Sequence, residues 1–318
     1  MVSNMSEQRQ EPADFIVPLN INGLEGRMLR LPARTKTNRE LLFIYGSHSS
    51  IERWFGLAQE LNKLGAVTMP DLPGFGGMTP LYKINKTASI DDLADYMAAF
   101  FKLKYKNKKV TVVSMSLGFV IVTRMLQRYP QLTKNVDILI SIVGFTHKED
   151  FNFTPGRLRV YHFASHIIAR KWPARLFRAV ALRPFVLRTV YHRTHNAKEK
   201  FADVAGDEFK RTMDIEIDLW HSNDVRTQFQ NYLDMFSLDN TQRPIPLPVY
   251  HVAAKKDRYF NNVKVEEHMR KIFTDFQMFY TAAPNHAPTV IATAKEAAPF
   301  IPAELRKVIR RKRIINKK

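Results

Sequence analysis

Cysteine is absent from the 318-residue chain, which excludes a disulfide scaffold, a thiol nucleophile and any cysteine-built metal site. No stretch reaches the roughly 18–20 uncharged apolar residues that a membrane-spanning helix needs. Residues 1–14 lack the apolar run of a signal peptide. Because 45% of the residues are hydrophobic, we expect a buried core and not disorder. These features predict a soluble, cytoplasmic, globular protein.

Negative charge is also scarce, since 49 Lys and Arg against 30 Asp and Glu give a net charge of +19. Residues 151–200 hold eleven basic and one acidic residue, and residues 302–318 hold eight and one. Residues 201–243 have the opposite balance, with four basic and nine acidic residues. A basic surface favours nucleic acid, anionic lipid or an acidic substrate. The alternative is that residues 151–200 pair with residues 201–243.

Short apolar runs alternate with helical patterns along most of the chain, which is typical of a parallel α/β sheet. Strands are expected at residues 15–21, 27–31, 41–45, 66–69, 109–113, 136–143, 249–253 and 276–280. Helices are expected at residues 51–64, 90–103, 117–128 and 263–273, and in a tail from 288. The turn at Asn22-Gly23 indicates an antiparallel edge hairpin. The pattern predicts a mostly parallel eight-stranded sheet flanked by helices.

Residues 147–245 interrupt this alternation with an arginine-rich, aromatic-rich helical pattern that ends in a proline cluster. The interruption follows the carboxyl end of an expected strand, where open α/β sheets bind ligands. We therefore expect a helical cap over a site. The predicted organisation is a core in two parts (1–146 and 246–301), the cap (147–245) and a basic tail (302–318).

One strand runs through Ser114-Met115-Ser116-Leu117-Gly118 directly into a helix. Such a tight strand–turn–helix, the nucleophile elbow, raises one side chain above the sheet and needs small residues two positions before and after it. Ser114 stands where the usual pattern has glycine. The N–H of Leu117, at the start of the helix, would face a developing oxyanion. The motif predicts that Ser116 is a nucleophile, and a tight-turn serine is the alternative.

At this point the chain resembles the α/β-hydrolase family. That family usually has His-Gly and a second oxyanion donor after the third strand, where this chain has Tyr45-Gly46-Ser47-His48. The resemblance implies that the backbone N–H of Ser47 is this donor, although Tyr45 replaces the usual histidine. Residues 71–76, DLPGFG, match the family's structural signature after the fourth strand. We expect Tyr45, His48 and Met115 to contact the substrate.

The resemblance extends to a Ser-His-Asp triad. Asp257 follows the seventh expected strand and His286 follows the eighth, so the chain order Ser116, Asp257, His286 is that of the family. In such a triad Ser116 attacks a carbonyl carbon while His286 takes the proton of its hydroxyl, and Asp257 orients the imidazole of His286. Taken singly, Asp257 could cap a helix and His286 could begin one.

Serine at the elbow disfavours the alkyl-enzyme chemistry of epoxide hydrolases and leaves esters, thioesters and amides. The first expectation is a serine esterase acting on carboxylic esters (EC 3.1.1), with lipid-like acyl esters favoured by the apolar, basic cap. The second is an aminopeptidase resembling proline iminopeptidases, with Glu216 or Asp218 holding the amino group. The third is an inactive binding module, suggested by Tyr45 and Ser114.

No cofactor fingerprint is present, and we expect neither a cofactor nor a metal. The pairs His162/His166 and His192/His195 have close spacings but no adjacent acid in the manner of a metal motif.

The tail carries the expected partner surface besides the ester substrate. The first interpretation is a solvated basic tail. The alternative is that an apolar stripe of Leu305, Val308, Ile309 and Ile315 beside eight basic residues attaches the protein peripherally to an anionic inner membrane face. Nucleic acid is disfavoured because the tail lacks interleaved aromatic residues.

Overall fold

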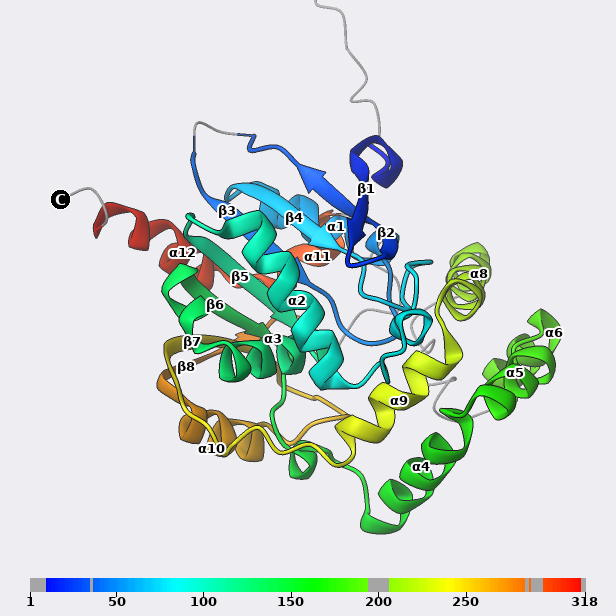
Figure 1. Cartoon of the computed structure of the whole chain (residues 1–318). Helices are drawn as coiled ribbons and strands as arrows, with labels where there is room; N and C mark the ends of the chain where they lie inside the picture. The colour runs from blue at the N-terminus through cyan, green and yellow to red at the C-terminus, as the bar shows by residue number, and fades with distance from the viewer. Residues whose placement is uncertain (1–9, 35–36, 194–205, 284–285, 287–293, 316–318) are drawn as a thin grey trace, which may run out of the picture.

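The computed structural model describes residues 10–34, 37–193, 206–283, 286 and 294–315. Its centre is an eight-stranded sheet with the strand order β1-β2-β4-β3-β5-β6-β7-β8 (Figure 1). β2 (Leu24–Leu31) is antiparallel to both β1 (Ile16–Ile21) and β4 (Ala66–Pro70), and the other neighbouring strands are parallel. The predicted mostly parallel sheet is confirmed.

The strands at the centre of the sheet are buried on both faces. The remaining strands are β3 (Glu40–Ile44), β5 (Val110–Met115), β6 (Val136–Ile142), β7 (Ile245–Ala254) and β8 (Phe273–Thr281). Every residue of β4 and β5 is buried, so these strands are nearly continuous apolar runs.

Helices cover both faces of the sheet. They are α1 (Ile51–Asn62), α2 (Ile90–Tyr105), α3 (Leu117–Arg128), α10 (Asn262–Ile272), α11 (Ala294–Ala297) and α12 (Ala303–Ile315). In Figure 1, α2 and α3 lie in front of the sheet, whereas α1 and α11 lie behind it.

Three strands, β2, β7 and β8, begin three or four residues earlier than the sequence pattern predicts. β2 starts at Leu24 because Asn22 and Gly23 both have positive φ, 53° and 79°, and form a two-residue turn. β7 starts at Ile245 and passes through Pro246 and Pro248. It pairs with β6 only from Val249 onward, and its register with β8 shifts between Ile245 and Pro248, so the two prolines lie where the pairing is missing on one side and irregular on the other.

Between β6 and β7 the chain forms what we call the helical region (residues 147–244). It contains α4 (Pro155–Ile168), α5 (Lys171–Val180), α6 (Pro184–Arg193), α8 (Gly206–Ser222) and α9 (Val225–Met235). The helices share a small buried cluster separate from the main core: Ala174, Leu182, Leu187, Met213, Ile217 and Val225. In Figure 1, α9 lies between the sheet's helices and α4, and α4–α6 lie outermost.

The C-terminal helix α12 packs against the core. Leu305 and Ile309 are buried, and Arg306 holds the helix to Glu60 through a 3.0 Å ion pair. The expectation that these apolar residues form an outward stripe for a membrane is therefore wrong, because they face the protein; the side chain of Ile315 lies outside the described residues. Within the described part of the chain, no helix has the length and apolar character that crossing a membrane requires.

Candidate active site

Ser116 occupies the turn between β5 and α3 with φ 49° and ψ −121°. This backbone conformation is strained for a residue with a side chain, as at many functional sites. A Cβ at Gly118 would lie 2.4 Å from the carbonyl oxygen of Tyr45, and a Cβ at Gly46 would lie 3.1 Å from the Cβ of Ser116. The two glycines therefore let α3 and the loop after β3 approach each other at Ser116.

Ser114, which replaces the first glycine of the elbow, is fully buried. Its hydroxyl donates a hydrogen bond to the carbonyl of Ile140 on β6, at 3.3 Å. The added hydroxyl thus has a partner in the neighbouring strand, and the departure from the family pattern leaves the turn intact.

The structure brings together the three residues predicted as a triad. His286 Nε2 lies 3.4 Å from Ser116 Oγ, and His286 Nδ1 lies 2.7 Å from Asp257 Oδ2. The other carboxylate oxygen of Asp257 accepts the N–H groups of Tyr259 and Phe260, at 2.8 and 3.1 Å. Because a carboxylate only accepts, Nδ1 carries the hydrogen and the lone pair of Nε2 faces the serine.

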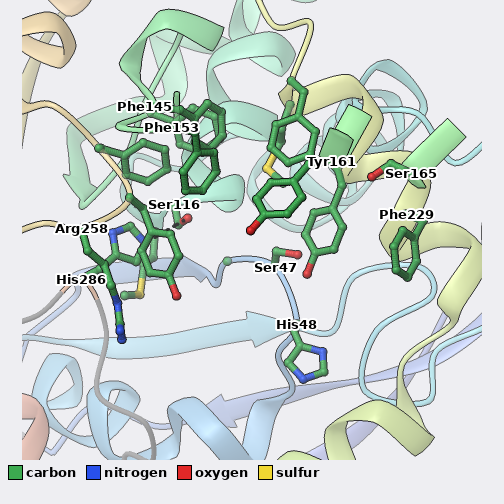
Figure 2. A pocket seen from close by; sticks show the side chains of 18 of the residues that line it. Ser47, His48, Ser116, Phe145, Phe153, Tyr161, Ser165, Phe229, Arg258 and His286 are labelled. Carbon is green, nitrogen blue, oxygen red and sulfur yellow. Dashed lines mark hydrogen bonds between the residues drawn. The ribbon is translucent and has the colours of Figure 1, made fainter. Parts of the chain in front are cut away.

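A cavity of about 470 Å³ opens beside Ser116. Its wall is mainly aromatic and comprises Trp54, Phe145, Phe151, Phe153, Tyr161, Trp220, Phe229, Tyr232, Phe236, Tyr259 and Phe260. Figure 2 shows Ser116 and His286 on one side of this space and Phe229 and Ser165 on the other. The carboxyl ends of the strands thus supply the side of the cavity that holds Ser116 and His286, and the helical region supplies the opposite wall.

Both predicted oxyanion positions adjoin the serine. Leu117 is the first residue of α3, so its N–H has no carbonyl to donate to within the helix. Ser47 lies in the loop between β3 and α1 and lines the same cavity as Ser116, as does Met115. These positions suit donors aimed at a carbonyl bound at Ser116.

Tyr45 does not line the cavity, and its assignment as a substrate contact is wrong. Its buried hydroxyl donates to Asp71 at 2.6 Å and accepts the N–H of Leu72 at 3.0 Å. Arg27 Nε also contacts Asp71, at 2.7 Å. Burial raises the pKa of Asp71 to about 7, although Arg27 opposes the shift. Tyr45 is a structural residue that ties β3 to the turn after β4.

His48 lines the cavity but contacts the helical region. Its Nε2 lies 3.3 Å from Glu216 Oε2, and its Nδ1 lies 3.2 Å from Gln228 Oε1. Arg53 Nη1 lies 3.8 Å from the other carboxylate oxygen of Glu216, which is fully buried. The ring of His48 is 4.4 Å from that of Trp220. A buried charged group therefore joins the core to α8 at the cavity wall.

Sequence reasoning missed this group, although one cue exists. Glu216 falls on the apolar face of α8, near the buried Met213 and Ile217, where a charge needs a partner. Nothing local in the sequence indicates that Arg53 and His48 are the partners. Asp218, on the same helix, is exposed and does not line the cavity.

Of the two histidine pairs considered for metal binding, only His162/His166 falls within the described side chains. His162 and His166 are exposed on α4, and the side chains of His192 and His195 lie outside the described residues.

A different group has ligand atoms within 4.8 Å of one another: His147, Glu149 and His268. Nδ1 of His268 forms a 2.6 Å hydrogen bond with the buried Asp150. The pKa of His147 is lowered mainly by burial and secondarily by the nearby charge of His268. These contacts link the start of the helical region to α10, and we assign no metal to them.

The family model for the alpha/beta hydrolase fold matches residues 40–287. The chain belongs to the alpha/beta hydrolase family. Solved structures with the same fold include a thermophilic esterase from Thermogutta terrifontis, with a TM-score of 0.63 and 15% identity, covering 94% of this chain and 98% of that chain. An epoxide hydrolase from Bacillus megaterium has a TM-score of 0.64 and 16% identity, covering 95% of this chain and 100% of that one.

An N-acyl homoserine lactonase is similarly close, with a TM-score of 0.61 and 16% identity, covering 93% of this chain and 96% of that chain. At these identities the likeness to the solved structures extends to the fold and not to the reaction. No curated protein sequence matches this alpha/beta hydrolase.

Proposed function

We propose that this alpha/beta hydrolase cleaves carboxylic esters through an acyl-enzyme on Ser116. The observation that carries the proposal is the chain of contacts from Ser116 Oγ to His286 and on to Asp257, at 3.4 and 2.7 Å, beside an apolar cavity. A serine hydroxyl is a weak nucleophile and needs such a base.

The reaction follows from the properties of these groups. Ser116 Oγ attacks the ester carbonyl while His286 Nε2 takes its proton, and Asp257 stabilises the imidazolium. The backbone N–H groups of Leu117 and Ser47 hold the oxyanion. The C–O bond then breaks, and the imidazolium gives its proton to the leaving alcohol. Water, activated by the same imidazole, hydrolyses the acyl-enzyme and restores the serine.

The cavity wall supports an apolar acyl group. Its side chains are largely aromatic, and pockets of this size take ligands of drug-like dimensions. Lipid-like acyl esters fit this wall better than small polar esters. A serine nucleophile also favours ester cleavage over the epoxide opening named for one structural neighbour.

The aminopeptidase alternative receives less support. Both carboxylate oxygens of Glu216 face core residues, His48 and Arg53, and Asp218 is exposed. Glu216 lines the cavity, but its carboxylate already has these two partners, and Asp218 does not line the cavity. Turnover of proline amides without turnover of esters would select that alternative.

The inactive-module alternative is also weakened. The two departures that suggested it, Tyr45 and Ser114, each have a structural partner away from the reacting groups.

A fluorophosphonate probe tests the proposal directly. Wild type and Ser116→Ala are incubated with the probe, and the intact mass and the labelled peptide are determined. We expect one adduct, on Ser116, that is absent from the variant. Folded wild type that forms no adduct, or one labelled at another residue, would contradict the proposal. Esters of increasing acyl length then define the substrate range.

A further inference from the structure

Large apolar side chains are exposed to an unusual degree on the outer part of the helical region. Most of the strongly exposed large hydrophobic residues described in the chain fall between residues 160 and 190. They are Val160, Phe163, Ile167, Trp172, Leu176, Val180, Phe185 and Val190, with exposed fractions between 39% and 72%. Scattered exposed apolar residues are ordinary, but a concentration of this kind marks an interaction surface.

These residues form stripes along the helices. On α5, Trp172, Leu176 and Val180 are spaced four residues apart, so they share one face, while Ala174 on the other side is buried. On α4, Val160, Phe163 and Ile167 have the same kind of spacing. We call the two stripes, together with Phe185 and Val190 of α6, the outer face. In Figure 1 these three helices lie farthest from the sheet.

Basic side chains surround the outer face. The sequence from 151 to 193 contains no Asp or Glu. The basic residues on α4–α6 and their connections whose side chains are described are all exposed: Arg157, Arg159, Arg170, Lys171, Arg175, Arg178, Arg183 and Arg188. Among the described residues, Arg188 is the one member of this set that forms an ion pair, with Asp214 at 2.9 Å.

The combination of exposed tryptophan, leucine and phenylalanine with unneutralised arginine is that of an interfacial helix. Such helices bury an apolar face at the boundary of lipid headgroups and acyl chains, while their basic residues contact anionic headgroups. A second copy of this chain is a poorer occupant, because its own outer face would bring like charges together.

We propose that the outer face docks onto an anionic lipid bilayer. This assigns membrane contact to α4–α6 and not to the C-terminal tail, whose apolar residues Leu305 and Ile309 are buried. The docking does not depend on the proposed esterase activity. If that activity holds, the location has a consequence, since the opposite side of α4 lines the cavity through Tyr161, Ala164 and Ser165. A lipid ester would then reach the cavity from the bilayer.

Vesicle co-sedimentation of the full chain tests the docking. Vesicles of phosphatidylcholine alone are compared with vesicles containing 30% phosphatidylserine, at low and at high salt. We expect binding to the anionic vesicles to be at least about tenfold tighter at low salt and to weaken with salt as screening grows. Trp172 adds a local signal, because its fluorescence should shift to the blue on docking and Trp172→Phe should lose that shift.

Two pairs of variants locate the surface. The triple variant Trp172→Ser, Leu176→Ser, Val180→Ser should bind at least about tenfold more weakly. The control variant Leu103→Ser, Val263→Ser removes apolar side chains that are equally exposed, 71% and 78%, but lie on α2 and α10 beside the sheet. It should bind vesicles as wild type does.

Charge reversal provides the second pair. Lys171→Glu, Arg175→Glu should weaken binding by a similar factor. Lys307→Glu, Arg310→Glu, on exposed positions of α12, should not. Thermal unfolding checks that each variant is folded.

Three results would overturn the inference: equal binding to both kinds of vesicle at low salt, wild-type binding by the folded outer-face variants, or loss of binding only in the α12 variant. A dimer in sedimentation velocity that the triple variant dissociates, without vesicle binding by wild type, would assign the outer face to a second copy instead. None of these results depends on whether Ser116 is acylated.

Discussion

The surroundings of Ser116, at the carboxyl ends of the strands, and the outer face of the helical region differ in how their polar and apolar side chains are buried and paired. Around Ser116, two carboxylates have defined partners: Asp71 contacts Tyr45 and Arg27, and Asp257 contacts His286 and two backbone N–H groups. On the outer face, large apolar side chains are exposed and basic residues mostly lack acidic partners among the described residues.

This difference separates two tasks. A reacting serine needs a fixed base and a strained turn, so its surroundings are packed and paired. An interaction surface must keep its binding groups unpaired until the partner arrives. The group of His48, Arg53 and Glu216 lies where the two regions meet, at the cavity wall.

Ser116→Ala and His286→Ala should have the largest effect and should act on one region alone. Each should lower ester turnover by a factor on the order of a million, because the attacking oxygen or its base is lost. Steady-state kinetics on a short water-soluble ester provides the measurement. Trp172→Ser should leave that rate within a factor of about two, since Trp172 is outside the cavity. A large loss in Trp172→Ser would break the separation.

Glu216→Gln tests the boundary between the regions. It should lower the free energy of unfolding by about 4 kcal/mol, because the half-buried Arg53 loses the charge of the fully buried Glu216 that compensates it. Urea denaturation measures the change. Asp218→Asn, the exposed neighbour on α8, is the matched control and should change stability by less than about 0.5 kcal/mol. Equal effects of the two substitutions would show that the buried group does not hold the regions together.

Two glycines sharpen the comparison further. Gly118→Ala should cost about 3 kcal/mol, because the new Cβ would overlap the carbonyl oxygens of Tyr45 and Ile44 at 2.4 and 2.5 Å. Gly156→Ala, in α4, meets no atom within 4 Å and should be neutral or stabilising. Urea denaturation of both variants measures the change in the free energy of unfolding. A tolerated Gly118→Ala would mean that α3 and β3 are not closely packed at Ser116.

The smallest effect is a pH dependence of the core. Burial lowers the pKa of His251 to about 3, while Asp257 opposes the shift. Below the ordinary pKa of 6.5 the unfolded chain gains a proton at His251 that the folded chain does not, so His251 lowers stability as pH falls toward 3. Its contribution between pH 7 and pH 5 should be a loss of about 2 kcal/mol, whereas the raised pKa of Asp71 acts in the opposite direction over the same range. The contribution of His251 is therefore the difference between wild type and His251→Gln.

His251→Gln, which keeps a hydrogen-bonding group beside Ser141, should reduce that loss. His162→Gln on the exposed side of α4 should leave it unchanged. An unchanged pH dependence in His251→Gln would assign the loss to other groups.

Local patterns explain what the sequence could predict. The elbow around Ser116, and the positions of Asp257 and His286 after their strands, depend on short motifs and on strand order, and the structure brings these residues together. Tyr45 was misjudged because its partner, Asp71, lies 26 residues away in the turn after the next strand of the chain.

The group around Glu216 was missed for the same reason, since Arg53 and His48 are more than 160 positions distant in the chain. Residues 151–200 and 201–243 have opposite charge, but composition does not fix pairing. Among the described residues, Arg188–Asp214 is the one ion pair between these two segments. Asp203 and the side chains of Asp207 and Glu208 lie outside the described residues.

The most direct test of the central claim is to trap the acyl-enzyme. Wild type is mixed with a 4-nitrophenyl ester, quenched in acid within the first turnover, and its intact mass and peptides are measured. The account predicts a mass increase equal to the acyl group, on the peptide that contains Ser116, and none in Ser116→Ala. Ester turnover without acylation of Ser116, or undiminished turnover by Ser116→Ala, would contradict it.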